Sequence, residues 1–114
     1  MNLHPVLRSL AGAAAVLGAL ASAPALAQSV AVTSIVEHPA LDSVKDGVRE
    51  ALTKAGYTEA KGLKWQFQTA QGNTAIAAQI ARKYVGDKPD VIVAIATPSA
   101  QAVVAATKTI PVVY

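Results

Sequence analysis

The stretch Val91–Gln101, Val-Ile-Val-Ala-Ile-Ala-Thr-Pro-Ser-Ala-Gln, decides the fold. Its first six residues are all apolar and rich in β-branched side chains, as in a strand covered on both faces of a parallel sheet. Thr97 suits the N-cap of a following helix, and Pro98 suits its first helical position, where a missing N–H costs nothing. The free N–H groups of the first turn face the space beyond the strand, so this stretch predicts a site for a carboxylate or phosphate.

Strands and helices alternate along the rest of the chain. Apolar or alternating runs predict strands over 30–36, 63–69 and 110–114, and apolar residues three and four apart predict helices over 39–55 and 74–85. Strict alternation in the second strand marks it as an edge strand, whereas the all-apolar strands belong inside the sheet. We therefore predict a doubly wound parallel sheet in the order 2-1-3-4, with the first helix on one face and the other two on the opposite face.

Local signals predict several caps and packing contacts. Asn73 suits an N-cap, Gly56 suits the C-cap of the first helix, and Glu50 and Lys54 are placed for an ion pair on the helix surface. Trp65 and Phe67 lie on one face of the edge strand and are interpreted as core residues. Four residues of the last helix are expected to face inward: Ala100, Val103, Val104 and Thr107.

The first 27 residues have the pattern of an export signal. Arg8 provides a basic start, residues 9–20 form an apolar segment too short to span a bilayer, and Ala25-Leu-Ala27 fits signal peptidase. Cleavage at Ala21-Ser-Ala23 and a retained membrane anchor are the alternatives. With no cysteine, the chain has neither disulfides nor a lipid-modified anchor, so we expect a periplasmic protein whose binding domain is 28–114.

Length and charge narrow the class of protein further. The 114 residues allow one small domain, and a net charge of +3 spread along the chain argues against nucleic-acid binding. The sequence has no dinucleotide fingerprint, Walker loop or G-x-S-x-G elbow, so neither catalysis nor a cofactor is expected. Because the sequence stops within the apolar strand 110–114, we interpret it as the front of a longer protein.

Ligands of open α/β sheets bind beyond the carboxyl ends of the strands, where the strand order reverses. Thr97 and Ser99 suit a carboxylate there, Glu37 suits an ammonium group, and Gln71 lies at the side of the same edge. His38 has no partner ligands at a suitable spacing, so no metal is expected.

Each of these candidates also has a structural explanation. Thr97 is a common capping residue, and the dipole favours an exposed acid such as Glu37 near a helix start. Gln71 belongs to a turn that leads into an N-cap. His38 is placed either to cap the first helix or to pair with Asp42.

Three segments resemble the periplasmic substrate-binding proteins of ABC transporters, and in particular the group associated with tryptophan and tyrosine uptake. The segments are residues 33–42, Ala70-Gln-Gly-Asn73 and Ile95-Ala-Thr-Pro-Ser-Ala-Gln101. The resemblance implies most of the N-terminal lobe of a type I two-lobed fold, which closes on an amino-acid-like ligand and delivers it to an ABC permease. It also implies that Thr97-Pro98-Ser99 holds the ligand carboxylate, while Glu37, His38 and Gln71 line the same cleft.

Two other functions are compatible with this fold. The first is a sensory module that hands its ligand to a chemoreceptor or a sensor kinase. The second is a flavodoxin-like enzyme, although the loop after the first strand lacks the hydroxyl-rich pattern that phosphate binding requires. The export signal argues against a transcription regulator.

Overall fold

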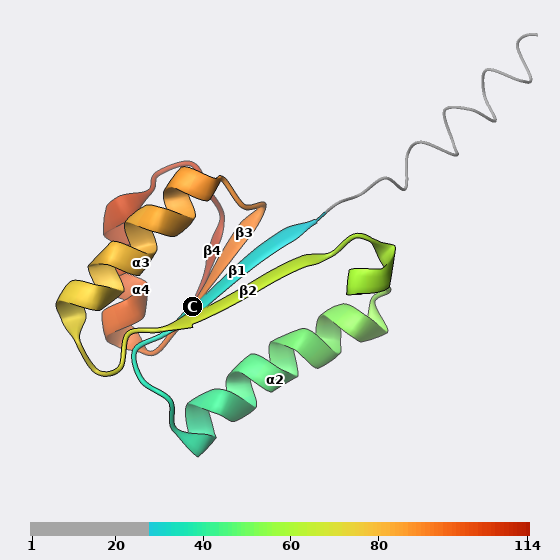
Figure 1. Ribbon diagram of the computed structural model, residues 1–114, viewed down its shortest axis with the longest axis horizontal. Helices are drawn as coiled ribbons and strands as arrows, with labels where there is room; N and C mark the ends of the chain where they lie inside the picture. The colour runs from blue at the N-terminus through green and yellow to red at the C-terminus, as the bar shows by residue number, and fades with distance from the viewer. Residues whose placement is uncertain (1–27) are drawn as a thin grey trace, which may run out of the picture.

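The computed structural model describes residues 28–114, and the predictions for the leader lie outside the described residues. Its parallel sheet has the order β2-β1-β3-β4, formed by β1 (Ser29–Ser34), β2 (Lys64–Thr69), β3 (Val91–Ile95) and β4 (Val112–Val113). Helix α2 (Pro39–Lys54) covers one face, and α3 (Thr74–Asp87) and α4 (Thr97–Ala106) cover the other (Figure 1). The short 3-10 helix η1 (Glu59–Lys61) leads into β2. The predicted strand order and the predicted distribution of helices are confirmed.

The core lies in two apolar clusters, one on each face of the sheet. Alternate residues of the inner strands point to opposite sides, so Ala31 and Ile92 pack toward α3 and α4, while Val32 and Val93 pack toward α2. The α3 and α4 side contains the largest fully buried side chain, Tyr84. Each fully buried Val, Leu or Ile contributes about 1.5–3 kcal/mol, so these inner strands anchor the domain.

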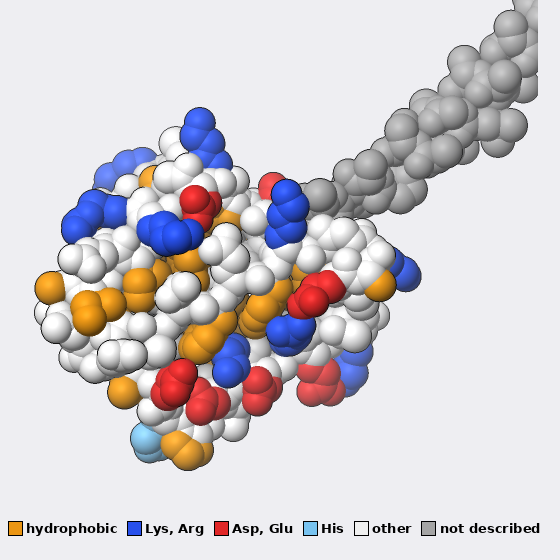
Figure 2. Space-filling view, in the orientation of Figure 1, with side chains coloured by type: hydrophobic (Ala, Val, Ile, Leu, Met, Phe, Trp, Pro, Cys, Tyr) orange, Lys and Arg blue, Asp and Glu red, His pale blue; other side chains and the backbone are white. Residues whose placement is uncertain are grey.

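Helix α2 packs on the sheet through half-buried Leu41, Val48 and Leu52, and none of its residues is fully buried. Long basic side chains add to this packing. The Nζ of Lys45 lies 4.5 Å from the centroid of the Phe67 ring, and the guanidinium of Arg49 lies 5.2 Å from that of Trp65. Trp65 and Phe67 are half-buried and pack against the cluster on this face, as predicted. Figure 2 shows acidic and basic side chains intermingled over α2. Neither this helix nor any other within 28–114 is long and apolar enough to cross a membrane.

A predicted cap and a predicted ion pair are confirmed, whereas the end of α2 differs by one residue from the prediction. The C-cap of α2 is Ala55, and the predicted Gly56 follows it with φ +93°, a left-handed conformation that glycine adopts without strain. Lys54 and Glu50 form the expected ion pair, with 3.0 Å between Nζ and Oε1. Asn73 caps α3, because its Oδ1 accepts hydrogen bonds from the N–H groups of Ala75 and Ile76 at 2.8 and 3.2 Å.

Substituting Asn73 by alanine is expected to lower the free energy of unfolding by about 1 kcal/mol, since two N–H groups lose their acceptor. Urea denaturation of the mature full-length protein measures this change. Gln79, exposed in the middle of the same helix, provides the control. Gln79→Ala removes no cap, so equal losses in the two variants would show that the Asn73 cap contributes nothing.

The start of α4 differs from the prediction. Ala96, and not Thr97, is the N-cap, and Thr97 and Pro98 are the first two helical residues. Ala96 leaves the strand with φ +77° and ψ +153°, and its carbonyl accepts the first helical hydrogen bond from Ala100 at 3.0 Å. The helix therefore begins one residue earlier than predicted, and the Thr97 side chain makes no capping bond.

The inward face of α4 is also only partly as predicted. Val103 is fully buried and Ala100 packs against the cluster, but Val104 is 43% exposed. Thr107 is the C-cap, and its Oγ1 accepts hydrogen bonds from the N–H groups of Thr109 and Ile110. The prediction was wrong for Val104 because none of the described elements covers that side of α4.

Candidate functional site

The first three strands end at the same level, and this alignment defines one edge of the sheet. Ser34, the last residue of β1, is the register partner of Thr69 at the end of β2 and of Ile95 at the end of β3. The loops that follow these strands therefore begin side by side. This edge includes the predicted point where the strand order reverses between β1 and β3.

The loop after β2 is fastened to the loop after β1. The N–H of Ala70 donates to the Ser34 carbonyl at 2.9 Å, and the N–H of Gly72 donates to the Ile35 carbonyl at 2.6 Å. Gln71 and Gly72 both have positive φ, which makes the tight turn between these two bonds. Gln71 and the segment that leads to Glu37 are consequently held together through the backbone.

Three helices begin at this edge, but their N-termini differ. The N-terminus of α2 is capped by His38, whose Nδ1 accepts from the Ala40 N–H at 3.2 Å, and Asp42 lies in its first turn. The N-terminus of α3 is capped by Asn73. The N-terminus of α4 has neither a side-chain cap nor an acidic residue in its first turn. Its free N–H groups and positive dipole end therefore make it the best suited of the three to an anion.

The predicted ligand residues all lie on the loops and helix starts of this edge, with different exposures. Glu37, His38, Gln71 and Thr97 are exposed, and Pro98 is half-buried. For His38 the structure shows the capping alternative, and for Gln71 it shows a turn immediately before the Asn73 cap. In both cases the side chain stays exposed at this edge, so His38 and Gln71 remain candidate ligand residues.

Ser99 is placed differently from the other candidates, because it is only 1% exposed. Its Oγ has no hydrogen bond partner among the described residues, and the same holds for the buried Oγ1 of Thr33. An unpaired buried hydroxyl costs free energy. The first turn of α4 thus contains a polar group that is not satisfied within this part of the chain.

Backbone strain at this edge is the feature that the sequence did not reveal. Ala96 has φ +77° and ψ +153°, a region that residues with a Cβ rarely adopt and that costs about 1–3 kcal/mol. An alanine in the sequence does not indicate a positive φ, whereas a glycine at this position would have suggested one. Such strain is concentrated at ligand sites, and here it turns the chain from β3 directly into α4.

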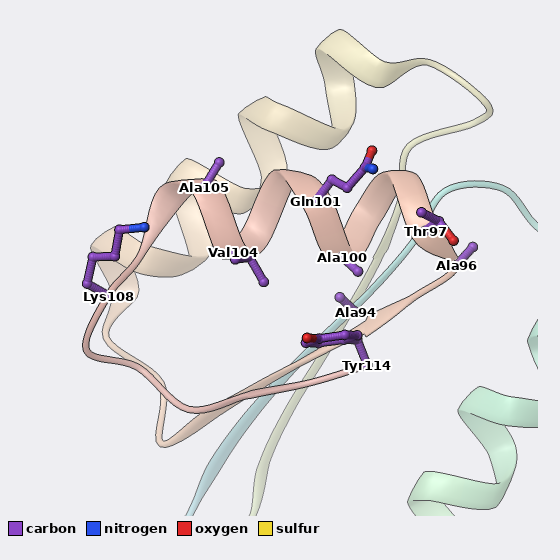
Figure 3. A pocket seen from close by; sticks show the side chains of 9 residues that line it. All are labelled: Ala94, Ala96, Thr97, Ala100, Gln101, Val104, Ala105, Lys108 and Tyr114. Atoms are coloured by element: carbon purple, nitrogen blue, oxygen red, sulfur yellow. The ribbon is translucent and has the colours of Figure 1, made fainter.

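A cavity of about 610 Å³ begins at this edge and continues along α4 (Figure 3). Ala96 and Thr97 line its end near the site, Lys108 lies toward its other end, and Tyr114 lies between them beside Ala94. Thr97 is the one predicted ligand residue that lines it. Most of this cavity therefore lies beside α4 and away from the loops after β1 and β2.

The chemistry of this edge suits reversible binding of a small polar molecule. It offers free backbone donors at α4, the exposed hydroxyl of Thr97, a carboxylate from Glu37 and an amide from Gln71, with the unpaired Ser99 hydroxyl buried behind them. Within residues 28–114, no cluster of three or more His, Asp and Glu side chains is placed to hold a metal ion. The fold is a doubly wound α/β lobe, and the strand ends at this edge form its candidate ligand site.

Comparison with known proteins identifies the family. Residues 29–114 match the model of the family described as ABC transporter substrate binding protein. The chain is 44% identical over 86 residues to a tyrosine-binding protein from Clostridioides difficile, which covers 75% of this chain and 25% of that protein. The chain belongs to the ABC transporter substrate-binding protein family, and it spans a quarter of the length of this curated relative.

Two solved structures show the same fold. A conserved domain protein from Vibrio cholerae is 58% identical and has a TM-score of 0.74, covering 75% of this chain and 29% of that one. The ABC domain from Streptococcus pneumoniae in complex with L-Trp is 33% identical, with a TM-score of 0.71, covering 75% of this chain and 28% of that one. Both likenesses support a periplasmic-binding-protein lobe, as the resemblance implied.

Proposed function

We propose that the full-length protein is an exported solute-binding protein that captures an amino-acid-like ligand, with an aromatic side chain, for an ABC importer. It binds and releases this ligand without catalysing a reaction. The leader pattern in residues 1–27 supports export to the periplasm, and family membership supports an ABC permease as the partner. The relatives named for tyrosine binding and for an L-Trp complex support the aromatic preference.

The uncapped start of α4 is the observation that carries this proposal. In the proposed complex, the ligand carboxylate accepts hydrogen bonds from the free N–H groups of Thr97 and Ser99 and from their hydroxyls. Pro98 lacks an N–H and directs the chain into the helix with its fixed φ. Glu37 pairs with the ligand ammonium group, and Gln71 and His38 line the same cleft.

Calorimetric titration of the mature full-length protein tests the proposal. We expect L-tyrosine or L-tryptophan to bind, and we expect the matched amines tyramine and tryptamine, which lack the carboxylate, to bind far more weakly. No heat with any amino acid would contradict the amino-acid assignment. Equal affinity for an amino acid and its amine would instead contradict the carboxylate site at α4.

Replacing Ser99 with alanine is expected to have opposite effects on ligand binding and on stability. The substitution removes a buried hydroxyl that has no partner, so the free energy of unfolding of the ligand-free protein should stay the same or rise by about 1 kcal/mol. Ligand affinity should fall about 10- to 100-fold, because a hydrogen bond to a charged group contributes about 1.5–3 kcal/mol.

Urea denaturation of the ligand-free protein and calorimetric titration measure these two effects of Ser99→Ala. Thr33→Val removes the other unpaired hydroxyl, which belongs to β1 and not to α4, and it serves as the control. A fall in affinity of equal size in both variants would show that Ser99 has no role of its own in binding.

A further inference from the structure

Gln28 directly follows the predicted export signal, and its backbone is already fastened to the sheet. The Gln28 carbonyl accepts a hydrogen bond from the Lys64 N–H of β2 at 2.8 Å. On the other side, the Ser29 N–H donates to Oδ2 of Asp90 at 2.7 Å, and the Ser29 carbonyl accepts from the Asp90 N–H at 2.9 Å. The chain is therefore held on both sides exactly where β1 begins.

Removal of the export signal gives Gln28 a new chemical property. Cleavage after Ala27, on which this inference rests together with the export proposed above, makes Gln28 the first residue and leaves it with an α-amino group. The neutral form of that group is a nucleophile, and roughly a tenth of it is neutral at pH 7. The amide carbon Cδ of the same residue is its electrophile, and their reaction closes an unstrained five-membered ring. Because both groups belong to one residue, they meet without an association step.

We propose that Gln28 is a modification site, at which the mature protein carries an N-terminal pyroglutamate. A bond forms between the α-amino nitrogen and Cδ, and the bond between Cδ and the side-chain amide nitrogen breaks. The departing nitrogen takes up the proton that the amine loses and leaves as ammonia, so the reaction needs no oxidant and no co-reactant. The ring nitrogen is an amide, and the mature chain loses the positive charge of its N-terminus.

The surroundings of Gln28 accommodate this ring. Within residues 28–114, neither its N–H nor its side-chain amide takes part in a hydrogen bond, and ring closure leaves the carbonyl bonded to Lys64 unchanged. Gln28 is half-buried, and an uncharged ring is buried at less cost than an ammonium group. The Asp90 carboxylate attracts the competing ammonium form, but Asp90 is exposed, and attraction between exposed charges is weak. Loss of ammonia to the solvent makes ring closure irreversible.

Peptide mass spectrometry of the full-length protein, expressed with its own leader and kept at neutral pH after purification, tests this modification. Reductive methylation of all amines precedes trypsin digestion, so that ring closure during digestion is not counted. Trypsin then cleaves at arginine alone and gives an N-terminal peptide of residues 28–49. We expect this peptide to carry no methyl label on its α-nitrogen and to weigh one ammonia less than its sequence requires.

Gln28→Asn is the matched control, because the same reaction would require a strained four-membered ring, and its α-amine should be labelled. A labelled α-amine on Gln28 would contradict the modification and leave the export proposal intact. An N-terminal peptide that starts at another residue would contradict cleavage after Ala27 and overturn the modification with it. Equal loss of ammonia from Gln28→Asn would place the reaction at a different residue. Calorimetric titration with amino acids tests the proposed ligand separately from all of these outcomes.

Discussion

Replacing Tyr84 with alanine is expected to lower the free energy of unfolding by about 3–5 kcal/mol, as for other large aromatic residues removed from a core. Tyr84 is fully buried on α3, and its hydroxyl donates to the Val32 carbonyl of β1 at 2.8 Å. The side chain thus fills the larger cluster and also fastens α3 to the central strand. Tyr84→Phe keeps the ring and should lose only about 0.5–1.5 kcal/mol.

High pH should lower the free energy of unfolding because of the same residue. Burial, together with the negative charge of Asp87, raises the pKa of the Tyr84 phenol well above its usual range. In the unfolded chain this phenol loses its proton near pH 10, while in the folded protein it stays protonated. The neutral phenol therefore contributes its full stabilisation below about pH 10. That contribution decreases as the pH rises further, because only the unfolded state then releases the proton.

Urea denaturation of the mature full-length protein at neutral pH and above pH 10 measures both effects. Tyr84→Phe should be less sensitive to high pH than the wild type. Tyr57→Phe removes a hydroxyl from a tyrosine that is 38% exposed, and it should change the stability little. An unchanged pH dependence in Tyr84→Phe would contradict the assignment of this effect to Tyr84.

Replacing Thr97 with aspartate is expected to weaken ligand binding about tenfold or more. Thr97 is exposed in the first turn of α4, where the ligand carboxylate is proposed to bind. Two like charges about 4 Å apart repel by about 1–4 kcal/mol at a protein surface. The same aspartate interacts favourably with the helix dipole, so the free energy of unfolding should stay the same or rise by about 0.3–1 kcal/mol.

The opposite signs of these two effects distinguish a lost site from a damaged fold. Thr97→Asn has nearly the same size as the aspartate and carries no charge, so it is the matched control for titration and for denaturation. If Thr97→Asp and Thr97→Asn bound an amino acid equally tightly, the ligand carboxylate would have to bind elsewhere. The corresponding amine should bind to Thr97→Asp more tightly than to Thr97→Asn, because the aspartate attracts a cation.

The sequence was informative about the fold because its strongest signals are periodic. The all-apolar runs of β1 and β3 and the alternation of β2 distinguish inner strands from an edge strand, and the strand order follows from that difference. Val104 shows where this reasoning ends. Periodicity identifies the apolar face of α4, but it does not show which residues of that face another element covers, and Val104 is exposed.

The candidate site was less predictable, because its geometry depends on backbone conformation and register. A threonine before a proline is a good N-cap signal, yet the positive φ of Ala96 starts α4 one residue earlier. The register that aligns Ser34 with Thr69 and Ile95 has no signature in any single segment. The burial of Ser99 likewise follows from how closely α4 lies on the sheet.

The helices on the two faces of the sheet are attached to it with unequal strength. Helices α3 and α4 bury Tyr84 and Val103, whereas α2 buries none of its own side chains and is held by half-buried residues and by the stems of Lys45 and Arg49. Detachment of α2 is therefore the least costly cooperative opening of the lobe. Glu37 and His38 lie just before α2 and would move with it, while Thr97–Ser99 stays on the rigid side. A ligand that bridges the two sides would suppress this opening, so part of its binding free energy would stabilise α2 against the sheet.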